Sequence, residues 1–489
     1  MKASRAVVIG SGFGGLAAAV RLRMKGYAVQ VLEALDQPGG RARVFRRNGF
    51  TFDAGPTVIT APHLIEELFA LAGRDMRDYV SLVPVDPFYR VMFHDGSEFD
   101  YVGDEERLLS QIEQFDPRDV DGYRRLAAHA ERIFDVGFTQ LSDRPFDSLS
   151  DMLRVLPAMT RLRSYRSVYG LVSEYIRDDR LRQLFTFEPL LVGGNPFSTT
   201  SIYLLIHWLE RKWGVHFAMG GTTSIISALV RLLCELGVDV HLDSPVEEIE
   251  VTNGRVKGVR VEGGQSIPAD VVVSNADPSY VYANMLCNVS RPVLPRPTRQ
   301  SMSLFVAYFG ARRTYPDLAH HTILLGPRYR GLLDDVFRRR VLADDFSLYL
   351  HAPTRTDDSL APPGCETFYV LSPVPNTRSG IDWVRESDGY FERILEHLEK
   401  RVLPSIGVNV VEPFFLTPRE FESDLRSVDG AAFGPEPVLT QSAYFRYHNR
   451  APEVDGLYFV GAGTHPGGGV PGVLSSAKVL DRIVPSMLT

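Results

Sequence analysis

The beginning of the chain alternates between apolar and glycine-rich segments in a way that predicts a strand, a helix and a second strand. Residues Arg5–Gly10 form a short apolar run, Ser11–Gly15 read as a tight turn, and Leu16–Gly26 as a helix that ends at a glycine. The apolar segment Tyr27–Glu33 follows directly as a second strand. A strand–helix–strand unit of about 30 residues is the repeating element of a parallel sheet.

The pattern changes twice in the middle of the chain. From Pro62 to Leu233 it is mainly helical, and Glu105–Phe115 and Asp119–Asp135 carry apolar residues at three- and four-residue spacing. From Val238 to Val273, short β-branched strands alternate with glycine turns. In that region, Asn253-Gly254 predicts a hairpin turn between the strands Val246–Val251 and Val256–Val261.

The last part of the chain returns to the pattern of its beginning. Residues Ser301–Phe421 mix strands and helices, and a final strand, Leu457–Gly461, runs into glycine-rich sequence and a last helix. Both ends of the chain therefore have the same pattern, a strand followed by glycine-rich sequence and a helix. At 489 residues the chain is too long for one ordinary core, so we expect two intertwined domains.

Composition narrows the class of protein. Hydrophobic residues make up 44% of the chain and charged residues 23%, which is typical of a globular enzyme. The formal net charge of -7 lacks the basic excess that binding to nucleic-acid phosphates requires, so nucleic acid is not expected as a partner.

Cysteine usage and apolar stretches bear on the compartment. Cys234, Cys287 and Cys365 are far apart and form no C-x-x-C pair, so we expect a reducing cytoplasm and no metal site. The glycines in the first apolar run argue against a signal peptide. Two long uncharged stretches, 189–209 and 456–477, are interrupted by glycine and proline, so no transmembrane helix is expected.

The first turn carries a dinucleotide-binding motif. Gly10, Gly12 and Gly15 match G-x-G-x-x-G between the predicted strand and helix. The first glycine permits the turn, the second lets a pyrophosphate approach the backbone, and the third lets helix and strand pack closely. The free N–H groups of the helix would face the phosphates. Glu33 ends the second strand, where a carboxylate accepts hydrogen bonds from the adenosine ribose.

Two short segments downstream specify the cofactor further. Pro38–Ala42, with Gly40 and Arg41, and Asp53–Thr57 resemble the flavoprotein superfamily of amine oxidases and carotenoid desaturases, in which the arginine lies near the cofactor. This resemblance implies FAD rather than NAD.

The C-terminal stretch Leu457–Val473 is the most specific part of the sequence. Its many glycines would allow close approach of a planar ring, and a helix that begins near Val470 would direct its positive end at the flavin pyrimidine and stabilise an anionic reduced flavin. The stretch resembles the C-terminal signature of bacterial phytoene desaturases. Further segments that resemble this family are 52–60, 87–90, 191–197, 320–329 and 441–450, although the family commonly has proline where this chain has Tyr447.

The resemblance implies a fold and a set of cofactor-binding residues. The fold class would be α/β and α+β, with a Rossmann-like FAD-binding domain built from 1–60, 215–275 and 440–489, a mainly helical, membrane-facing region at 61–214, and a mixed-sheet substrate domain at 276–439. The predicted cofactor-binding residues are Gly10, Gly12, Phe13, Gly14, Gly15, Glu33, Gly40, Arg41, Gly55, Pro56, Thr57, Val246, Gly461, Ala462, Gly463, Gly469, Val470, Pro471 and Gly472.

The resemblance also implies the chemistry: desaturation of phytoene, an apolar C40 polyene, to neurosporene or lycopene, by hydride transfer to flavin N5 and loss of a proton. Oxygen or a quinone would reoxidise the flavin. No general base can be assigned from the sequence. Asp143, Asp147 and Arg166 read mainly as surface charges, and His465 reads mainly as a structural hydrogen-bonding residue in a turn.

Such a substrate has to be collected from a membrane. Between Met152 and Leu171, four arginines (Arg154, Arg161, Arg163 and Arg166) alternate with apolar residues and no acid is present. This segment is either a surface that rests on anionic lipid or a helix packed inside the substrate domain. We expect a cytoplasmic protein associated peripherally with the inner face of the cell membrane.

Other functions remain open. Within the superfamily they are a C30 squalene-type desaturase, a carotenoid isomerase or an amine oxidase, although the flavin signature has no cysteine for a covalent link. A non-catalytic lipid-binding protein like the GDP dissociation inhibitors is the alternative of another class. The final product, the electron acceptor and the oligomeric state are not determined by the sequence.

Overall fold

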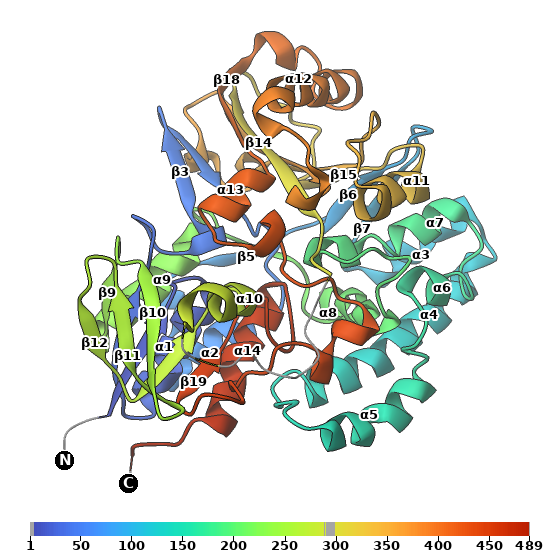
Figure 1. Cartoon of the computed structure of the whole chain (residues 1–489). Helices are drawn as coiled ribbons and strands as arrows, with labels where there is room; N and C mark the ends of the chain where they lie inside the picture. The colour runs from blue at the N-terminus through green and yellow to red at the C-terminus, as the bar shows by residue number, and fades with distance from the viewer. Residues whose placement is uncertain (1–3, 288, 290–298, 489) are drawn as a thin grey trace.

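The two ends of the chain meet in one parallel sheet of five strands. The computed structural model describes residues 4–287, 289 and 299–488. In the sheet, every neighbouring pair of strands is parallel, and the C-terminal strand lies at one edge (Figure 1). The strands, in spatial order, are β19 (Leu457–Phe459), β13 (Val271–Ser274), β1 (Arg5–Ile9), β2 (Ala28–Leu32) and β9 (Asp239–His241). The predicted strands at both chain ends are thus confirmed.

Helices α1 (Phe13–Met24) and α14 (Val470–Ile483) pack against each other beside this sheet. The buried guanidinium of Arg21 in α1 forms ion pairs with Glu67, at 2.9 Å, and with Asp481 of α14. The prediction that the first helix starts at Leu16 is wrong by three residues. The helix begins at Phe13 and includes Gly14 and Gly15, because a helix that starts so close to its strand needs residues without side chains in its first turn.

A separate three-stranded antiparallel sheet packs beside the first. It consists of β10 (Val246–Thr252), β11 (Arg255–Val261) and β12 (Ser266–Pro268). The predicted hairpin turn is confirmed: Asn253 and Gly254 both have positive φ, at 51° and 71°, as a two-residue hairpin turn requires.

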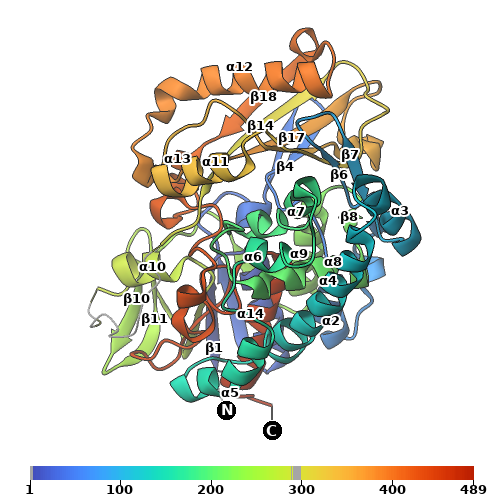
Figure 2. The ribbon, with the colours of Figure 1, turned by 90° about the vertical axis from the view of Figure 1, so that its right-hand side faces the viewer.

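A seven-stranded sheet forms the other half of the molecule, and α12 (Trp383–Arg401) covers its outer face (Figure 2). Its strands, in spatial order, are β18 (Val410–Leu416), β14 (Ser303–Ala311), β17 (Glu366–Val374), β16 (Leu348–His351), β15 (His321–Leu324), β6 (Tyr89–Met92) and β7 (Glu98–Tyr101). Strands β6 and β7 lie in the segment that we expected to be mainly helical. They are short, and β6 pairs with β15, which comes much later in the chain, so no local pattern marks them.

A group of helices from the middle of the chain lies beside the two larger sheets (Figure 1). α3 (Glu105–Phe115) has the predicted bounds, and α4 (Asp119–Phe134) ends one residue before its predicted end. The other helices here are α2 (His63–Leu71), α5 (Leu149–Arg161), α6 (Val168–Val172), α7 (Asp179–Leu184), α8 (Leu205–Trp213) and α9 (Thr222–Glu235). Elsewhere lie β3 (Val44–Arg47), β4 (Phe50–Asp53), β5 (Leu82–Pro84), β8 (His216–Ala218), α10 (Pro278–Tyr280), α11 (Tyr329–Asp334) and α13 (Pro418–Ser423).

None of the helices in the described part of the chain combines the length and the apolarity that a bilayer span requires.

Candidate active site

The glycine turn after β1 has the geometry that its motif predicts. Gly10 has a φ of +89°, and its N–H donates to the carbonyl oxygen of Leu32 at 2.7 Å. Gly12 is the N-cap of α1. A Cβ atom on Gly15 would lie 1.9 Å from the carbonyl oxygen of Gly10, so this glycine allows the helix to pack on the strand.

Glu33 is buried at the end of β2 and also supports the turn. Its Oε2 accepts hydrogen bonds from the Ser11 N–H at 2.7 Å and from the Ser11 hydroxyl at 2.6 Å, and its Oε1 accepts one from the Leu35 N–H at 3.1 Å. The carboxylate is thereby fixed beside the first turn of α1. The motif indicated a role toward a ribose but not this second role.

Asn275 lies between the two glycine turns, and sequence reasoning missed it. Its Nδ2 is 2.9 Å from the position of a Cβ atom on Gly12, and its Oδ1 is 2.5 Å and 2.7 Å from such positions on Gly14 and Gly461. Asn275 directly follows β13, and the carboxyl ends of parallel strands are where ligand-binding residues collect. Its position directly after a strand was the feature of the sequence that could have indicated Asn275.

The C-terminal glycine loop joins β19 to α14. Gly461 has a φ of +97° and its N–H donates to the Ser476 hydroxyl at 2.8 Å. α14 begins at Val470, as predicted, with Gly469 as its N-cap. A Cβ atom on Gly14 would lie 3.1 Å from the amide nitrogen of Gly461, so glycines let the two turns approach closely.

Arg446 holds this loop in place. Its Nε donates to the carbonyl oxygen of Thr464 at 3.1 Å, and its Nη2 to that of Ala462 at 2.5 Å. Burial lowers the pKa of the guanidinium. The segment that contains it was recognised in the sequence, but without a role for this residue.

Arg41 presents a second, partly buried guanidinium to the site. Its Nη2 donates to the Ser427 hydroxyl at 2.9 Å, while its buried Nε has no hydrogen-bond partner among the described residues. Burial lowers its pKa, and the carboxylate of Asp277 opposes this shift. A buried cationic donor without a partner fits an oxygen-rich or anionic ligand.

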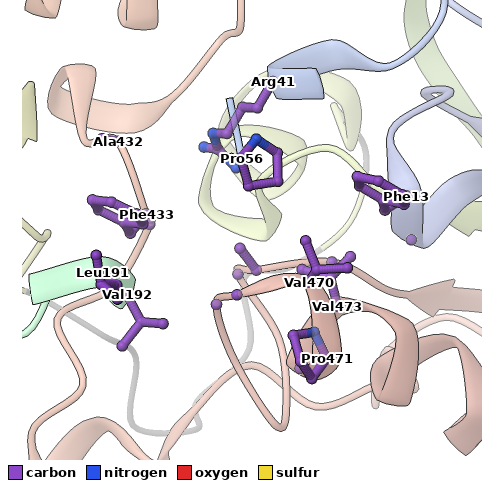
Figure 3. Close-up of a pocket in the computed structure, with 18 of the residues that line it drawn as sticks. Phe13, Arg41, Pro56, Leu191, Val192, Ala432, Phe433, Val470, Pro471 and Val473 are labelled. Carbon is purple, nitrogen blue, oxygen red and sulfur yellow. The ribbon is translucent and has the colours of Figure 1, made fainter. Parts of the chain in front are cut away.

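One cavity of about 560 Å³ collects these elements. All the predicted cofactor-binding residues except Gly15 line it, including Gly55, Pro56 and Thr57 from the loop after β4 and Val246 from β10. Figure 3 shows Arg41 and Pro56 on one side, with Val470 and Val473 of α14 opposite them.

The cavity continues into an apolar chamber. Its walls come from α5, from the segment around α8, and from the inner face of the seven-stranded sheet. They include Met152, Val155, Met159, Phe187, Leu190, Leu191, Leu205, Ile206, Leu209, Met302, Leu304, Ile323 and Leu325.

Glu210 on α8 is among the residues that line this cavity, and its carboxyl group is buried in the protein beside it. Its Oε1 accepts a hydrogen bond from the Tyr89 hydroxyl at 2.7 Å, and its Oε2 has no hydrogen-bond partner among the described residues. Burial, with the nearby carboxyl group of Glu188, raises the pKa of Glu210 well above its usual value. Sequence reasoning missed this residue, because an acid in an amphipathic helix normally faces water.

The other candidate residues lie as follows. His465 lines the cavity, its Nε2 pairs with the carbonyl oxygen of Leu141 at 3.1 Å, and burial lowers its pKa to about 4. Asp143 forms an ion pair with Arg482 at 3.0 Å. Asp147 and Arg166 are not among the residues that line the cavity, and Arg166 forms an ion pair with Glu174.

The parallel sheet with its two glycine turns, set against an apolar chamber, defines a flavin-binding oxidoreductase. The profile of a family described as "Flavin containing amine oxidoreductase" matches residues 13–479, and the chain belongs to this family. It is an FAD-dependent oxidoreductase.

Within the family, the chain belongs among the phytoene desaturases. A lycopene-forming phytoene desaturase from Pseudescherichia vulneris is 50% identical over 479 residues, which is 97% of each chain. A neurosporene-forming phytoene desaturase from Rhodobacter capsulatus is 44% identical over 492 residues, 98% of this chain and 94% of the relative. Cyclohexylamine oxidase from Brevibacterium oxydans shares the fold, with a TM-score of 0.62 at 17% identity over 98% of each chain.

Proposed function

We propose that the protein desaturates phytoene to neurosporene or lycopene in carotenoid biosynthesis. The observation that carries this proposal is one continuous cavity that begins at the two glycine turns and ends in an apolar chamber. The relatives named for these two products, at 50% and 44% identity, support it. They favour it over a C30 desaturase, an amine oxidase or a GDP dissociation inhibitor-like protein.

The residues present fit FAD. The turn at Gly10–Gly15 and Glu33 would hold the adenosine diphosphate part, and the loop from Gly461 to Gly472 with the N-terminus of α14 would hold the flavin. When bound, FAD supplies the hydride acceptor. The FAD-binding domain would comprise residues 1–60, 215–275 and 440–489. Strands from all three segments build the five-stranded parallel sheet or the three-stranded antiparallel sheet beside it.

The chain's own contribution is to bind an apolar polyene and to exclude water. A hydrocarbon has no groups that form hydrogen bonds with the chamber wall, so shape and burial have to position it. Glu210 lies next to Leu209 among the residues that line the cavity, and we assign to its buried carboxyl group the uptake of the proton that leaves the carbon next to the hydride donor.

Helix α5 supports entry from a membrane surface, because it has two apolar faces. Met152, Val155 and Met159 line the cavity. Leu149, Leu153 and Leu156, on the other face, are 54%, 59% and 49% exposed to solvent. A helix with one apolar face on the substrate chamber and another facing outward is suited to lie in a lipid interface.

The arginines of this segment carry less free charge than the sequence indicated. Arg154 pairs with Asp151 at 3.2 Å, and both Arg163 and Arg166 pair with Glu174. These acids lie just outside the segment Met152–Leu171. Contact with a bilayer would therefore depend more on the exposed leucines than on the arginines.

The function is tested by incubating the purified, FAD-loaded protein with phytoene in liposomes, under air or with an added quinone. We expect the absorption bands of neurosporene or lycopene, and the comparison of the two acceptors identifies the one that is used. Unchanged phytoene in both mixtures, with FAD bound, would refute the assignment.

Membrane docking is tested by liposome flotation of a variant in which Leu149, Leu153 and Leu156 are serine. We expect most of the binding to be lost. A variant with serine at Val384 and Val408, which are 72% and 85% exposed elsewhere on the surface, serves as the matched control and should float like the unaltered protein. Equal flotation of all three proteins would exclude α5 as the docking element.

A further inference from the structure

Three histidines meet behind the cavity wall. β15 and β16 are antiparallel, and their register places His321 opposite His351, while His320 immediately precedes β15. All three side chains are buried, at 5%, 0% and 1% exposure for His320, His321 and His351. One nitrogen atom from each ring can be chosen so that the three lie within 4.8 Å of one another.

The hydrogen bonds orient the rings of two of these residues in the same way. Nδ1 of His320 pairs with the Thr356 hydroxyl at 2.6 Å, and Nδ1 of His321 pairs with the Tyr349 hydroxyl at 2.7 Å. Both rings therefore use Nδ1 for an oxygen atom of a neighbouring side chain. Their Nε2 atoms are left for another partner.

The three Nε2 atoms have one hydrogen bond among them within the described residues. Those of His320 and His351 face each other at 3.0 Å, so at most one proton can be shared between them. Nε2 of His321 is buried and has no hydrogen-bond partner among the described residues. A cluster that served packing alone would be expected to satisfy this atom, because a buried polar atom without a partner costs free energy.

We propose that His320, His321 and His351 bind a divalent transition-metal ion of the zinc class through their Nε2 atoms. Imidazole nitrogen is a preferred ligand for such ions, and three histidines with an open fourth position form a known type of site. The hydroxyl groups of Thr356 and Tyr349 supply the outer hydrogen bonds that metal-bound histidines normally make.

The protonation state of the three imidazoles suits metal binding. Burial lowers the pKa of all three imidazoles, so the rings are neutral and release no proton when they bind a metal ion. A carboxyl group is connected to the cluster through one aromatic ring: the Tyr89 ring lies 5.7 Å from that of His321, and its hydroxyl donates to the carboxyl group of Glu210. A cation would favour the ionised form of that carboxyl group.

The proposed ion would also fix a hydrogen-bond direction toward the cavity. With Nε2 on the metal, Nδ1 of His321 carries the proton and donates to the Tyr349 oxygen. The Tyr349 hydroxyl then donates to Thr57 Oγ1, 2.5 Å away. Both Tyr349 and Thr57 line the cavity, so the ion would act as a positioning element for its wall.

The test is a zinc titration of the metal-stripped, FAD-loaded full chain by calorimetry, with the metal content measured afterwards. We expect one ion per chain, and binding at least about 100-fold weaker in H320Q and H351Q. The matched control is H94Q, at an exposed histidine, which should bind zinc like the unaltered protein. Y349F should retain the ion with an affinity about 10-fold lower, because it removes only an outer hydrogen bond.

X-ray absorption of the zinc-loaded unaltered protein gives a readout that does not depend on folded variants. We expect three imidazole ligands. Absence of stoichiometric binding, a first shell without three imidazoles, or equal affinity in folded H320Q and H351Q would overturn the proposal. None of these outcomes depends on turnover of phytoene, so the proposed function can fail separately.

Discussion

The carbonyl oxygen of Gly10 occupies the space that a side chain at Gly15 would need, since a Cβ atom there would lie 1.9 Å from it. Gly10 directly follows β1 and Gly15 lies within α1, so secondary structure fixes the backbone at both positions. The first turn of α1 can therefore not accept even a methyl group without moving away from the strand. The motif glycine that does not line the cavity thus sets the position of those that do.

We predict that Gly15→Ala loses FAD and lowers thermal stability, because the helix has to shift relative to the strand. A backbone clash of this kind is expected to cost about 1–3 kcal/mol or more. Flavin absorbance after gel filtration and a thermal melt measure the two effects. Gly389→Ala is the matched control: Gly389 lies within α12 with nothing within 4 Å of its added Cβ atom, and alanine favours a helix. If both variants keep FAD and melt alike, the packing argument is wrong.

Arg41→Met tests the partly buried guanidinium beside the cavity. Methionine fills a similar volume without the charge, so the fold should persist. The substitution removes the Nε donor that has no hydrogen-bond partner among the described residues. We predict FAD binding weaker by about 10- to 100-fold, corresponding to one hydrogen bond to a charged group. Titration of the FAD-free protein, followed by flavin fluorescence, measures this change. Arg385→Met, at an arginine side chain that is 84% exposed, should leave the affinity unchanged.

Asp53 makes stability depend on pH. Its carboxylate accepts hydrogen bonds from the backbone N–H groups of Thr222 and Thr223, but burial dominates and raises its pKa to about 6. In the unfolded chain its pKa is about 3.9, so between these values the folded state holds more protons. Its contribution to stability is therefore complete below pH ~4 and is lost as the pH rises to ~6. The free energy of unfolding falls by about 3 kcal/mol over this interval.

Melting temperatures between pH ~4 and ~6 measure this effect, with Asp53→Asn as the comparison. Asparagine can accept the shorter hydrogen bond, from Thr222 at 2.8 Å, but does not titrate. We expect the melting temperature of the unaltered protein to fall more steeply over this interval than that of the variant. Parallel curves would show that Asp53 does not titrate there.

Features with local causes were predictable from the sequence, and features made by distant contacts were not. The spacing within α3 and the Asn253-Gly254 turn act over a few residues, and both are confirmed. The sheet position of β6 depends on its pairing with β15, and no local pattern shows it. The glycine turns were recognised because the need for residues without side chains arises within the turns themselves.

The missed site residues are those whose neighbours come from elsewhere in the chain. Asn275 is a single polar residue after a strand, and only the fold places it between the two glycine turns. His351 lies opposite His321 because of the strand register, so the sequence did not indicate that these histidines form a cluster. Burial of Glu210 likewise depends on the elements that pack around α8.

Glu210→Gln tests the assigned proton uptake. Glutamine retains the acceptor for the Tyr89 hydroxyl but cannot take up a proton, so we predict turnover lower by about 10²- to 10⁴-fold with FAD binding unchanged. Because burial raises the pKa of this carboxyl group, the unaltered enzyme should become more active as the pH rises and the carboxylate forms. The residual activity of the variant should lose that rise.

Single-turnover reduction of the bound flavin by phytoene, followed by absorbance across pH, isolates the chemical step from product release. Glu113→Gln, at an exposed glutamate of α3, is the control and should retain both the rate and its pH dependence. Equal reduction rates in Glu210→Gln and the unaltered enzyme would remove Glu210 from the mechanism. They would leave the cofactor site and the apolar chamber in place, because neither depends on a titrating group at this position.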